Sequence, residues 1–301
     1  MWRFDTESGP WVVKVDKPWG DFWYGVAAQG GKFEAAAWDA GVAMAEPHRP
    51  VSDGVGLWQP IGEGRLAKAA RFLEGAHPVP PLSAPLAEWA GGTVAALARL
   101  GIVADPAVDA DYVIHPQDEW DEWLGEARDL GVLDAEQARA LKDASIRIAE
   151  ITEAGLASKP VKLVMHRDFS YLNILVTAEG PVLLDFDSAG PSVPWWEMIS
   201  VAWELAGPGL GVMEPERALV EAGLAGYAAA GGPIGATDES AFTGQLAGRL
   251  SSTAWELWMA CGHRNASPAS QAQLGRHLRL SIPALTTMLD ALPTWATWLK
   301  G

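Results

Sequence analysis

Three short apolar segments between residues 161 and 186 constrain the fold of this chain more than any other feature. They are VKLVM at 161–165, ILV at 174–176 and VLLDF at 182–186, and the turn-forming segment TAEG separates the second from the third. Runs of this length and composition, bounded by turn residues, are typical of β-strands. The region therefore predicts a strand, a loop, a second strand, a turn and a third strand.

The polar residues that follow these strands can carry phosphoryl-transfer chemistry. Asp168 and Asn173 lie five positions apart in the loop, and Asp185 lies near the end of the third strand. Transfer of a phosphoryl group from a nucleotide requires a carboxylate near the attacking hydroxyl, oxygen ligands for Mg²⁺ and neutralisation of the phosphate charge. These three side chains supply the oxygen groups.

The same loop resembles a motif of the protein-kinase-like superfamily. His166, Arg167 and Asp168, followed by Asn173, are similar to the H-x-D-x-x-x-x-N loop, and Asp185 matches the metal-binding aspartate that comes after it. An H-R-D triplet alone occurs by chance, because aspartate is common in turns and a histidine can simply be part of the core. The spaced set, flanked by three β segments, indicates the family because motif and context agree.

The residues after the third strand limit the resemblance to one branch of this superfamily. They read DFDSAG at 185–190 and are followed by Trp-Glu at 196–197, a pattern most similar to the aminoglycoside phosphotransferase and choline kinase branch. The resemblance covers nearly the whole chain. It implies that ATP or GTP binds with Mg²⁺ between a small β-rich lobe and a larger helical lobe, since clefts between lobes commonly bind cofactors.

The resemblance also implies a role for each residue of the loop. Asp168 would be the catalytic residue that accepts or orients the proton of the substrate hydroxyl. Asn173 and Asp185 would hold Mg²⁺, which prefers a few protein oxygens together with phosphates and water. His166 and Arg167 would support the loop.

Lys14 and Glu34 are the candidate nucleotide-binding residues. Lys14 lies in WVVKV, where the family has the strand lysine that contacts the phosphates, and Glu34 lies 20 residues later, where the family keeps a glutamate that pairs with that lysine. A surface lysine and a solvated helix glutamate are the alternatives. Asp187 is a supporting residue with three open interpretations: a contact behind the metal ligands, a metal ligand, or the cap of a helix or turn.

The start of the sequence departs from the family pattern. In the family a glycine-containing hairpin of two strands covers the nucleotide before the lysine strand, yet only 13 residues precede Lys14. Either the first strand of the family is missing, or the sequence begins inside a longer protein, or Lys14 is the wrong lysine. The glycines between residues 20 and 31 follow the lysine and do not form a family-like phosphate loop. A shortened cover would leave the phosphates more hydrated and their charge less stabilised.

Local patterns outline the elements on either side of this region. Residues 1–15 predict a β-hairpin, because aromatic and β-branched residues flank a Gly-Pro turn. Alanines and apolar spacing predict a helix over 32–45, and 46–75 predicts two or three more strands. A capping box of Asp134 and Gln137 predicts the start of a helix that runs to about Glu153.

A proline-dense segment, HPVPPLSAP at 77–85, disfavours both helix and central strand and marks a connection. The chain is therefore expected to have an α+β, two-lobed protein-kinase-like fold. Residues 1–76 would form the nucleotide-binding lobe, apparently shortened at its start. Residues 77–301 would form the larger, mainly helical lobe that carries catalysis and substrate binding.

The charge of the chain bears on its partners. Twenty-two lysines and arginines against 38 aspartates and glutamates give a net charge of −16, which repels nucleic acid and attracts cationic small molecules. Solubility alone is an equally good explanation. The acidic residues at 118–122, with Glu197, Glu204 and Glu256, could line a pocket for ammonium groups. Ordinary solvated helix faces are the simpler interpretation, and for Glu197 a structural role is favoured.

The single cysteine, Cys261, excludes an intrachain disulfide and a cysteine-based zinc site. The first residues lack the basic region and apolar run of a secretory signal. The longest uncharged stretch, 222–237, has 16 residues and five glycines, too short to span a membrane. We expect a cytoplasmic protein with no membrane or nucleic-acid partner, whose oligomeric state stays open.

These observations predict an ATP-dependent phosphotransferase that requires Mg²⁺ and phosphorylates a hydroxyl of a small, cationic molecule of the aminoglycoside or amino-sugar type. The resemblance associates such an activity with antibiotic resistance. Two alternatives stay open. One is a catalytically silent kinase-like binding or regulatory protein, and the other is a kinase for choline, homoserine, a plain sugar or a cyclic peptide antibiotic.

Overall fold

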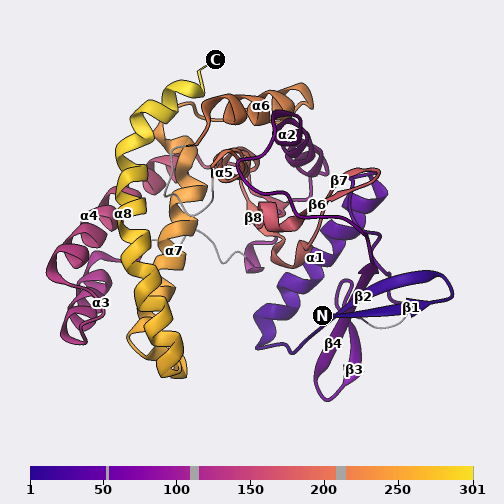
Figure 1. Ribbon diagram of the computed structural model, residues 1–301, viewed down its shortest axis with the longest axis horizontal. Coiled ribbons are helices and arrows are strands. Elements are labelled where there is room, and N and C mark those ends of the chain that lie inside the picture. The colour runs from indigo at the N-terminus through magenta and orange to yellow at the C-terminus, as the bar shows by residue number, and fades with distance from the viewer. Residues whose placement is uncertain (52–53, 109–114, 208–214, 301) are drawn as a thin grey trace. The chain divides into compact units, whose positions relative to one another are not determined.

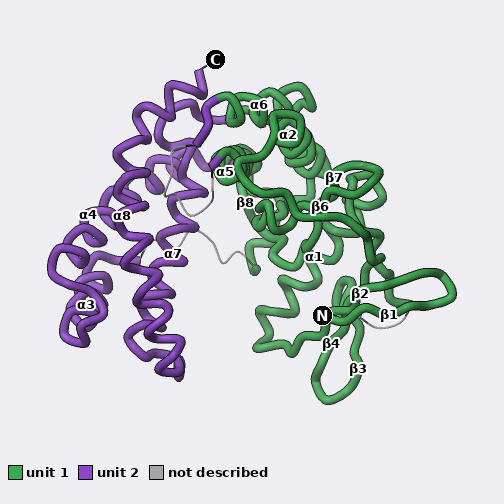
Figure 2. The backbone as a smooth tube through the Cα atoms, viewed as in Figure 1, with its two compact units in different colours: residues 1–111, 161–206, 218–234 green, residues 112–160, 207–217, 235–301 purple. Residues whose placement is uncertain are grey.

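The computed structural model describes residues 1–51, 54–108, 115–207 and 215–300. It combines small antiparallel sheets with a larger helical part (Figure 1). The chain divides into two compact units (Figure 2), one formed by residues 1–111, 161–206 and 218–234 and the other by the remaining residues. Every residue of the predicted catalytic, metal and nucleotide sites belongs to the first unit. The predicted lobe boundary at 76/77 stays a prediction.

The N-terminal sheet has four antiparallel strands in the order β1-β2-β4-β3. The strands are β1 (Trp2–Thr6), β2 (Gly9–Asp16), β3 (Gln59–Gly62) and β4 (Arg65–Arg71). The hairpin of β1 and β2 closes at Gly9, whose φ of +108° only glycine adopts readily. The predicted hairpin and the two later strands are confirmed.

Helix α1 extends from Asp21 to Asp39, so the prediction of a helix over 32–45 is wrong at both ends. Gly25, Gly30 and Gly31 lie inside the helix, and Gly31 lets it approach neighbouring backbone. A Cβ atom at Gly31 would lie 2.6 Å from the backbone nitrogen of Leu57, closer than packing permits. At the other end the chain leaves the helix after Asp39, and Met44 forms a β-bridge with Leu183.

The central region forms four short strands, which are β5 (Leu163–Met165), β6 (Ile174–Thr177), β7 (Gly180–Leu183) and β8 (Gly190–Ser192). Strands β6 and β7 form an antiparallel hairpin, and β5 pairs with β8. The predicted succession of strand, loop, strand, turn and strand is confirmed. The third strand ends at Leu183, two residues before Asp185.

Among the described residues, three further helices lie in the first unit and pack through small residues. They are α2 (Ala84–Arg99), α5 (Pro194–Ala206) and α6 (Arg217–Ala229). A Cβ atom on Gly91 of α2 would lie 1.9 Å from the carbonyl oxygen of Gly223 on α6. The close approach of α2 and α6 therefore requires glycine at position 91.

The second unit is helical. It contains α3 (Gln117–Asp129), α4 (Ala135–Ala157), α7 (Thr243–Ala260) and α8 (Pro268–Trp298). Helix α4 begins with the predicted capping box, in which Asp134 accepts from the backbone N–H of Gln137 and the Gln137 side chain accepts from that of Asp134. Of the helices in the described ranges, none has the length and apolar character needed to cross a membrane.

Candidate active site

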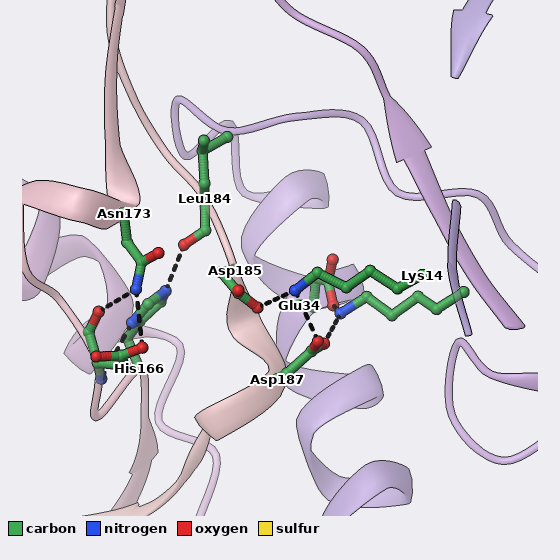
Figure 3. A network of polar contacts seen from close by, with 9 residues as sticks. Lys14, Glu34, His166, Asn173, Leu184, Asp185 and Asp187 are labelled. Atoms are coloured by element: carbon green, nitrogen blue, oxygen red, sulfur yellow. Dashed lines mark hydrogen bonds and ion pairs between the residues drawn. The ribbon is translucent and has the colours of Figure 1, made fainter. Parts of the chain in front are cut away.

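His166 is the buried anchor of the loop that follows β5. Its Nε2 donates to the carbonyl oxygen of Leu184, at 3.0 Å, and its Nδ1 accepts from the backbone N–H of Asp168, at 3.3 Å (Figure 3). Burial beside the ring of Phe186 lowers the pKa of His166 to about 4. The ring is therefore neutral near pH 7, with its proton on Nε2, and it ties the loop to the segment that leads to Asp185.

Arg167 is held by a contact from helix α5. Its backbone has a φ of +64°, a conformation that residues other than glycine seldom adopt, and its N–H donates to Oε1 of Glu197, at 3.0 Å. Glu197 is buried, and burial raises its pKa to about 7 against the opposing effect of Arg167. Glu197 thus has the structural role favoured from the sequence and does not present its carboxylate to solvent.

Asp168 and Asn173 form a hydrogen-bonded pair within the loop. The amide nitrogen of Asn173 donates to Oδ2 of Asp168, at 2.9 Å, and to the Asp168 carbonyl oxygen, at 2.7 Å. Partial desolvation, with a contribution from the charge of Asp185, raises the pKa of Asp168 despite the bond from Asn173. The carboxylate is accordingly a stronger base than that of a free aspartate. Because both amide protons of Asn173 point to Asp168, its amide oxygen is the atom that can bind a cation.

Asp185 lies in the tight turn after β7. Its φ of +61° is again in the left-handed region, and such unfavourable backbone conformations cluster at functional sites. Its Oδ1 accepts from Nζ of Lys14, at 2.5 Å. The structure thus brings Lys14 from β2 to the predicted metal-binding aspartate.

Asp187 bridges two lysines. Its Oδ2 accepts from Lys14, at 2.8 Å, and its Oδ1 accepts from Lys68, at 2.5 Å. Burial opposes ionisation, but Lys68 and Lys14 together hold the pKa of Asp187 below its usual value. Asp187 thus lies against both lysines, and its three interpretations stay open.

The prediction of an ion pair between Lys14 and Glu34 is wrong. Glu34 pairs with Lys68 on β4, with Oε2 and Nζ 2.6 Å apart, while Lys14 pairs with Asp185 and Asp187 (Figure 3). Burial lowers the pKa of each lysine, but the neighbouring carboxylates outweigh it and raise both. Burial raises the pKa of Glu34, with Lys68 opposing.

The sequence interpretation did not identify Lys68. The strand RLAKAAR shows only that a lysine lies in a short β-segment. Its place in the site follows from the register of β2 and β4, which sets Lys14 opposite Lys68. No local pattern encodes that register. Lys68 could have been identified only by predicting that its strand pairs with the strand of Lys14, 54 positions earlier in the sequence.

The oxygen donors fit a Mg²⁺ site with few protein ligands. Among the described residues, no group of three or more His, Cys, Asp or Glu side chains is arranged to hold a metal ion. A site formed by the amide oxygen of Asn173 and the carboxylate of Asp185 contains only one residue of these four types, Asp185. That donor set suits Mg²⁺, which typically keeps several waters and binds one or two carboxylates together with substrate phosphates.

Several residues of the predicted acidic pocket contact lysine or histidine side chains within the second unit. Lys142 pairs with Asp121, His115 lies 3.1 Å from Glu119, and His277 lies 2.8 Å from Glu256. A pocket for ammonium groups stays a prediction.

A family model described as the phosphotransferase enzyme family matches residues 1–235. No curated protein matches the chain. Among solved structures, an aminoglycoside phosphotransferase from Alicyclobacillus acidocaldarius is 13% identical, with 98% of this chain and 90% of that one covered and a TM-score of 0.63. An amicoumacin kinase in complex with AMP-PNP, Ca²⁺ and Ami is 15% identical, with coverages of 97% and 85% and a TM-score of 0.62.

A third structure, of a microcompartment-associated aminopropanol kinase, is 14% identical, with coverages of 95% and 87% and a TM-score of 0.62. At these identities the likeness shows the fold alone. It confirms the predicted α+β, protein-kinase-like fold, with a small N-terminal sheet and a larger helical part.

Proposed function

The chain belongs to the phosphotransferase enzyme family, and from this membership we propose that it is a small-molecule kinase. It transfers the γ-phosphoryl group of ATP or GTP, with Mg²⁺, to a hydroxyl of a small, cationic acceptor. One observation carries the proposal: Asp168, Asn173, Asp185 and Lys14 gather around a single loop and hairpin of the first unit.

Asp168 is the base of the proposed reaction. Its carboxylate accepts the proton of the acceptor hydroxyl as the oxygen bonds to the γ-phosphorus and the bond to the ADP leaving group breaks. Asn173 holds the carboxylate in place through its amide protons. A pKa above that of free aspartate favours this role, because a base gains efficiency as its pKa approaches the working pH.

The amide oxygen of Asn173 and the carboxylate of Asp185 are the residues that would hold Mg²⁺. When bound, the ion neutralises charge on the phosphates and polarises them for transfer. Lys14 lies at the same aspartate and contacts the phosphates once the nucleotide is in place. His166 and Glu197 keep the loop backbone fixed through their buried hydrogen bonds.

A hydroxyl-bearing amine is the acceptor class that the chemistry favours. The net charge of −16 raises the local concentration of cations. Two of the similar structures are named for aminoglycosides and for aminopropanol, compounds that combine an amino group with a hydroxyl. We include choline, a homoserine-type amino acid, a plain sugar and a cyclic peptide antibiotic as competing acceptors.

A coupled assay of ADP release over these acceptor classes tests the proposal, with Asp168→Ala as the blank. We expect Mg²⁺-dependent ADP release that rises above the rate with water for at least one hydroxyl-bearing amine and is absent in the variant. A wild-type protein that binds Mg²⁺ and nucleotide but releases no ADP with any acceptor would instead support the silent kinase-like protein.

A further inference from the structure

Two lysines face one another across the N-terminal sheet. The antiparallel register of β2 and β4 sets Lys14 opposite Lys68, and residues directly opposite in such a pair share one face of the sheet. Like charges in these positions are destabilising unless acidic groups compensate them. Glu34, Asp185 and Asp187 provide that compensation. The sheet thus brings a second cation to the site, for which the reaction described above has no task.

The two lysines differ in their surroundings. The side chain of Lys68 is only 8% exposed, and its ammonium group lies between Glu34, whose side chain is 6% exposed, and Asp187. The side chain of Lys14 is 25% exposed, and its partners Asp185 and Asp187 are exposed to a similar extent. A ligand that enters from solvent therefore meets Lys14 and Asp185, whereas Lys68 lies behind them.

We propose that Lys68 is a positioning residue of the kinase site. Its ammonium group ties Glu34 on α1 to Asp187, and this tie holds the turn that carries Asp185. Lys14 is then the lysine that contacts the phosphates. The inference rests on the proposed function, because it assigns the two cations to different tasks within that nucleotide site.

The ion pairs account for this division of tasks. Moving Lys68 toward a phosphate would leave the buried carboxylate of Glu34 unpaired, and a buried charge without a partner is strongly destabilising. Lys14, by contrast, can exchange its ion pairs with Asp185 and Asp187 for a contact with a phosphate. When it turns to a phosphate, Asp187 keeps Lys68 as its counter-ion, and Asp185 is released to bind Mg²⁺.

Calorimetric titration with Mg·AMP-PNP separates the two lysines. We expect Lys14→Met to raise the Kd at least about tenfold, a loss of about 1.4 kcal/mol. Lys68→Met should change it by less than about threefold. Lys17→Met is the matched control, because Lys17 is an exposed lysine just after β2, and its Kd should equal that of the wild type. A Kd for Lys68→Met as weak as that for Lys14→Met would overturn the assignment.

The positioning role is measured as hydrolysis of Mg·ATP with water as the acceptor. Rates are expressed per nucleotide-binding site counted by calorimetry, so that unfolded protein does not contribute. We expect Lys68→Met to be slower by about 10- to 100-fold, since small displacements at a reacting centre have effects of this size. A rate equal to that of Lys17→Met would contradict the inference.

Glu34→Gln provides a second route if Lys68→Met does not fold. It removes one end of the tie and leaves Lys68 paired with Asp187, so we expect the same slower hydrolysis with an unchanged Kd. An unchanged rate in this variant would also overturn the inference. Failure of the wild type to bind nucleotide would count against the proposed function itself, whereas a reversal between the two lysine variants would count only against their assignment.

Discussion

Asp168 is the residue that we propose as the general base. It lies on an exposed loop, hydrogen-bonded by Asn173, and its pKa is raised by desolvation and by Asp185. Replacing it by asparagine removes the base but keeps the shape of the side chain. We expect ADP release by Asp168→Asn to fall by about 10²- to 10⁴-fold, measured by the coupled assay. Nucleotide affinity from calorimetry is the control and should stay at the wild-type value, and a variant with more than a tenth of the wild-type rate would exclude Asp168 as the base.

Glu197 predicts a pH dependence of stability. Burial raises its pKa from 4.5 to about 7 in the folded protein, so the folded state binds the proton more tightly than the unfolded state does. Below pH 4.5 the carboxyl group therefore makes its maximal contribution to the free energy of unfolding. This contribution decreases by roughly 3 kcal/mol as the pH rises through 7. We expect wild type to lose this amount relative to Glu197→Gln between these pH values, as measured by urea unfolding.

His166 acts in the opposite direction and shows why the comparison with a variant is needed. Its pKa is lowered from 6.5 to about 4 by burial, so the folded state binds this proton less tightly and stability rises with pH over that interval. His166 gives the same pH dependence to the wild type and to Glu197→Gln, so its effect cancels in the difference between their free energies of unfolding. A difference that stays constant from pH 4.5 to 8 would show that Glu197 does not titrate as described.

The crossing of α2 and α6 depends on one glycine of an adjacent pair. A Cβ at Gly91 would lie 1.9 Å from the carbonyl oxygen of Gly223, whereas one at Gly92 would lie 3.9 Å from that of Gly226. We expect Gly91→Ala to destabilise the protein by about 1–3 kcal/mol through overpacking. Gly92→Ala should stabilise it by up to about 1 kcal/mol through helix propensity. Urea unfolding of the two variants checks this, and equal effects of the same sign would contradict the close approach.

The elements were predictable where their signals are local. The capping box of Asp134 and Gln137 and the turn before Gly9 each involve neighbouring residues, and both predictions are confirmed. The start of α1 was not predictable, because its glycines indicate a loop until the segment that packs against them is known. The backbone of Leu57, 26 residues later in the sequence, leaves room only for glycine at position 31.

The site follows the same division. Asp168 and Asn173 share one loop, and their spacing indicated a common site, whereas the hydrogen bonds between them were not predicted. Asp185 follows the next hairpin, as the sequence indicated. Lys14 was linked to Glu34 by analogy with the family, but the structure gives that glutamate to Lys68. Which of two lysines reaches a helix glutamate depends on strand register and helix position, and neither can be derived from residue spacing.

The net charge of −16 is a property of the entire chain, and it makes a prediction about the acceptor. Long-range attraction of a cation weakens once the ionic strength shortens the Debye length to about 10 Å or less. We expect the KM for a polycationic aminoglycoside to rise severalfold between about 20 and about 300 mM NaCl, measured from initial rates of ADP release. The KM for ATP measured in the same salt series is the internal reference, and a flat KM for the aminoglycoside would leave the acidic surface without a role in acceptor binding.

The central proposal is a Mg²⁺ site formed by Asp185 and Asn173 together with a bound nucleotide. Calorimetric titration of AMP-PNP into the wild type and Asp185→Ala, with Mg²⁺ and with EDTA, measures this directly. We expect the wild type to bind AMP-PNP at least about tenfold more tightly with Mg²⁺, and Asp185→Ala to bind it equally with and without the metal. Wild-type binding that is indifferent to Mg²⁺, or an Asp185→Ala variant that keeps the full effect of the metal, would contradict the proposal.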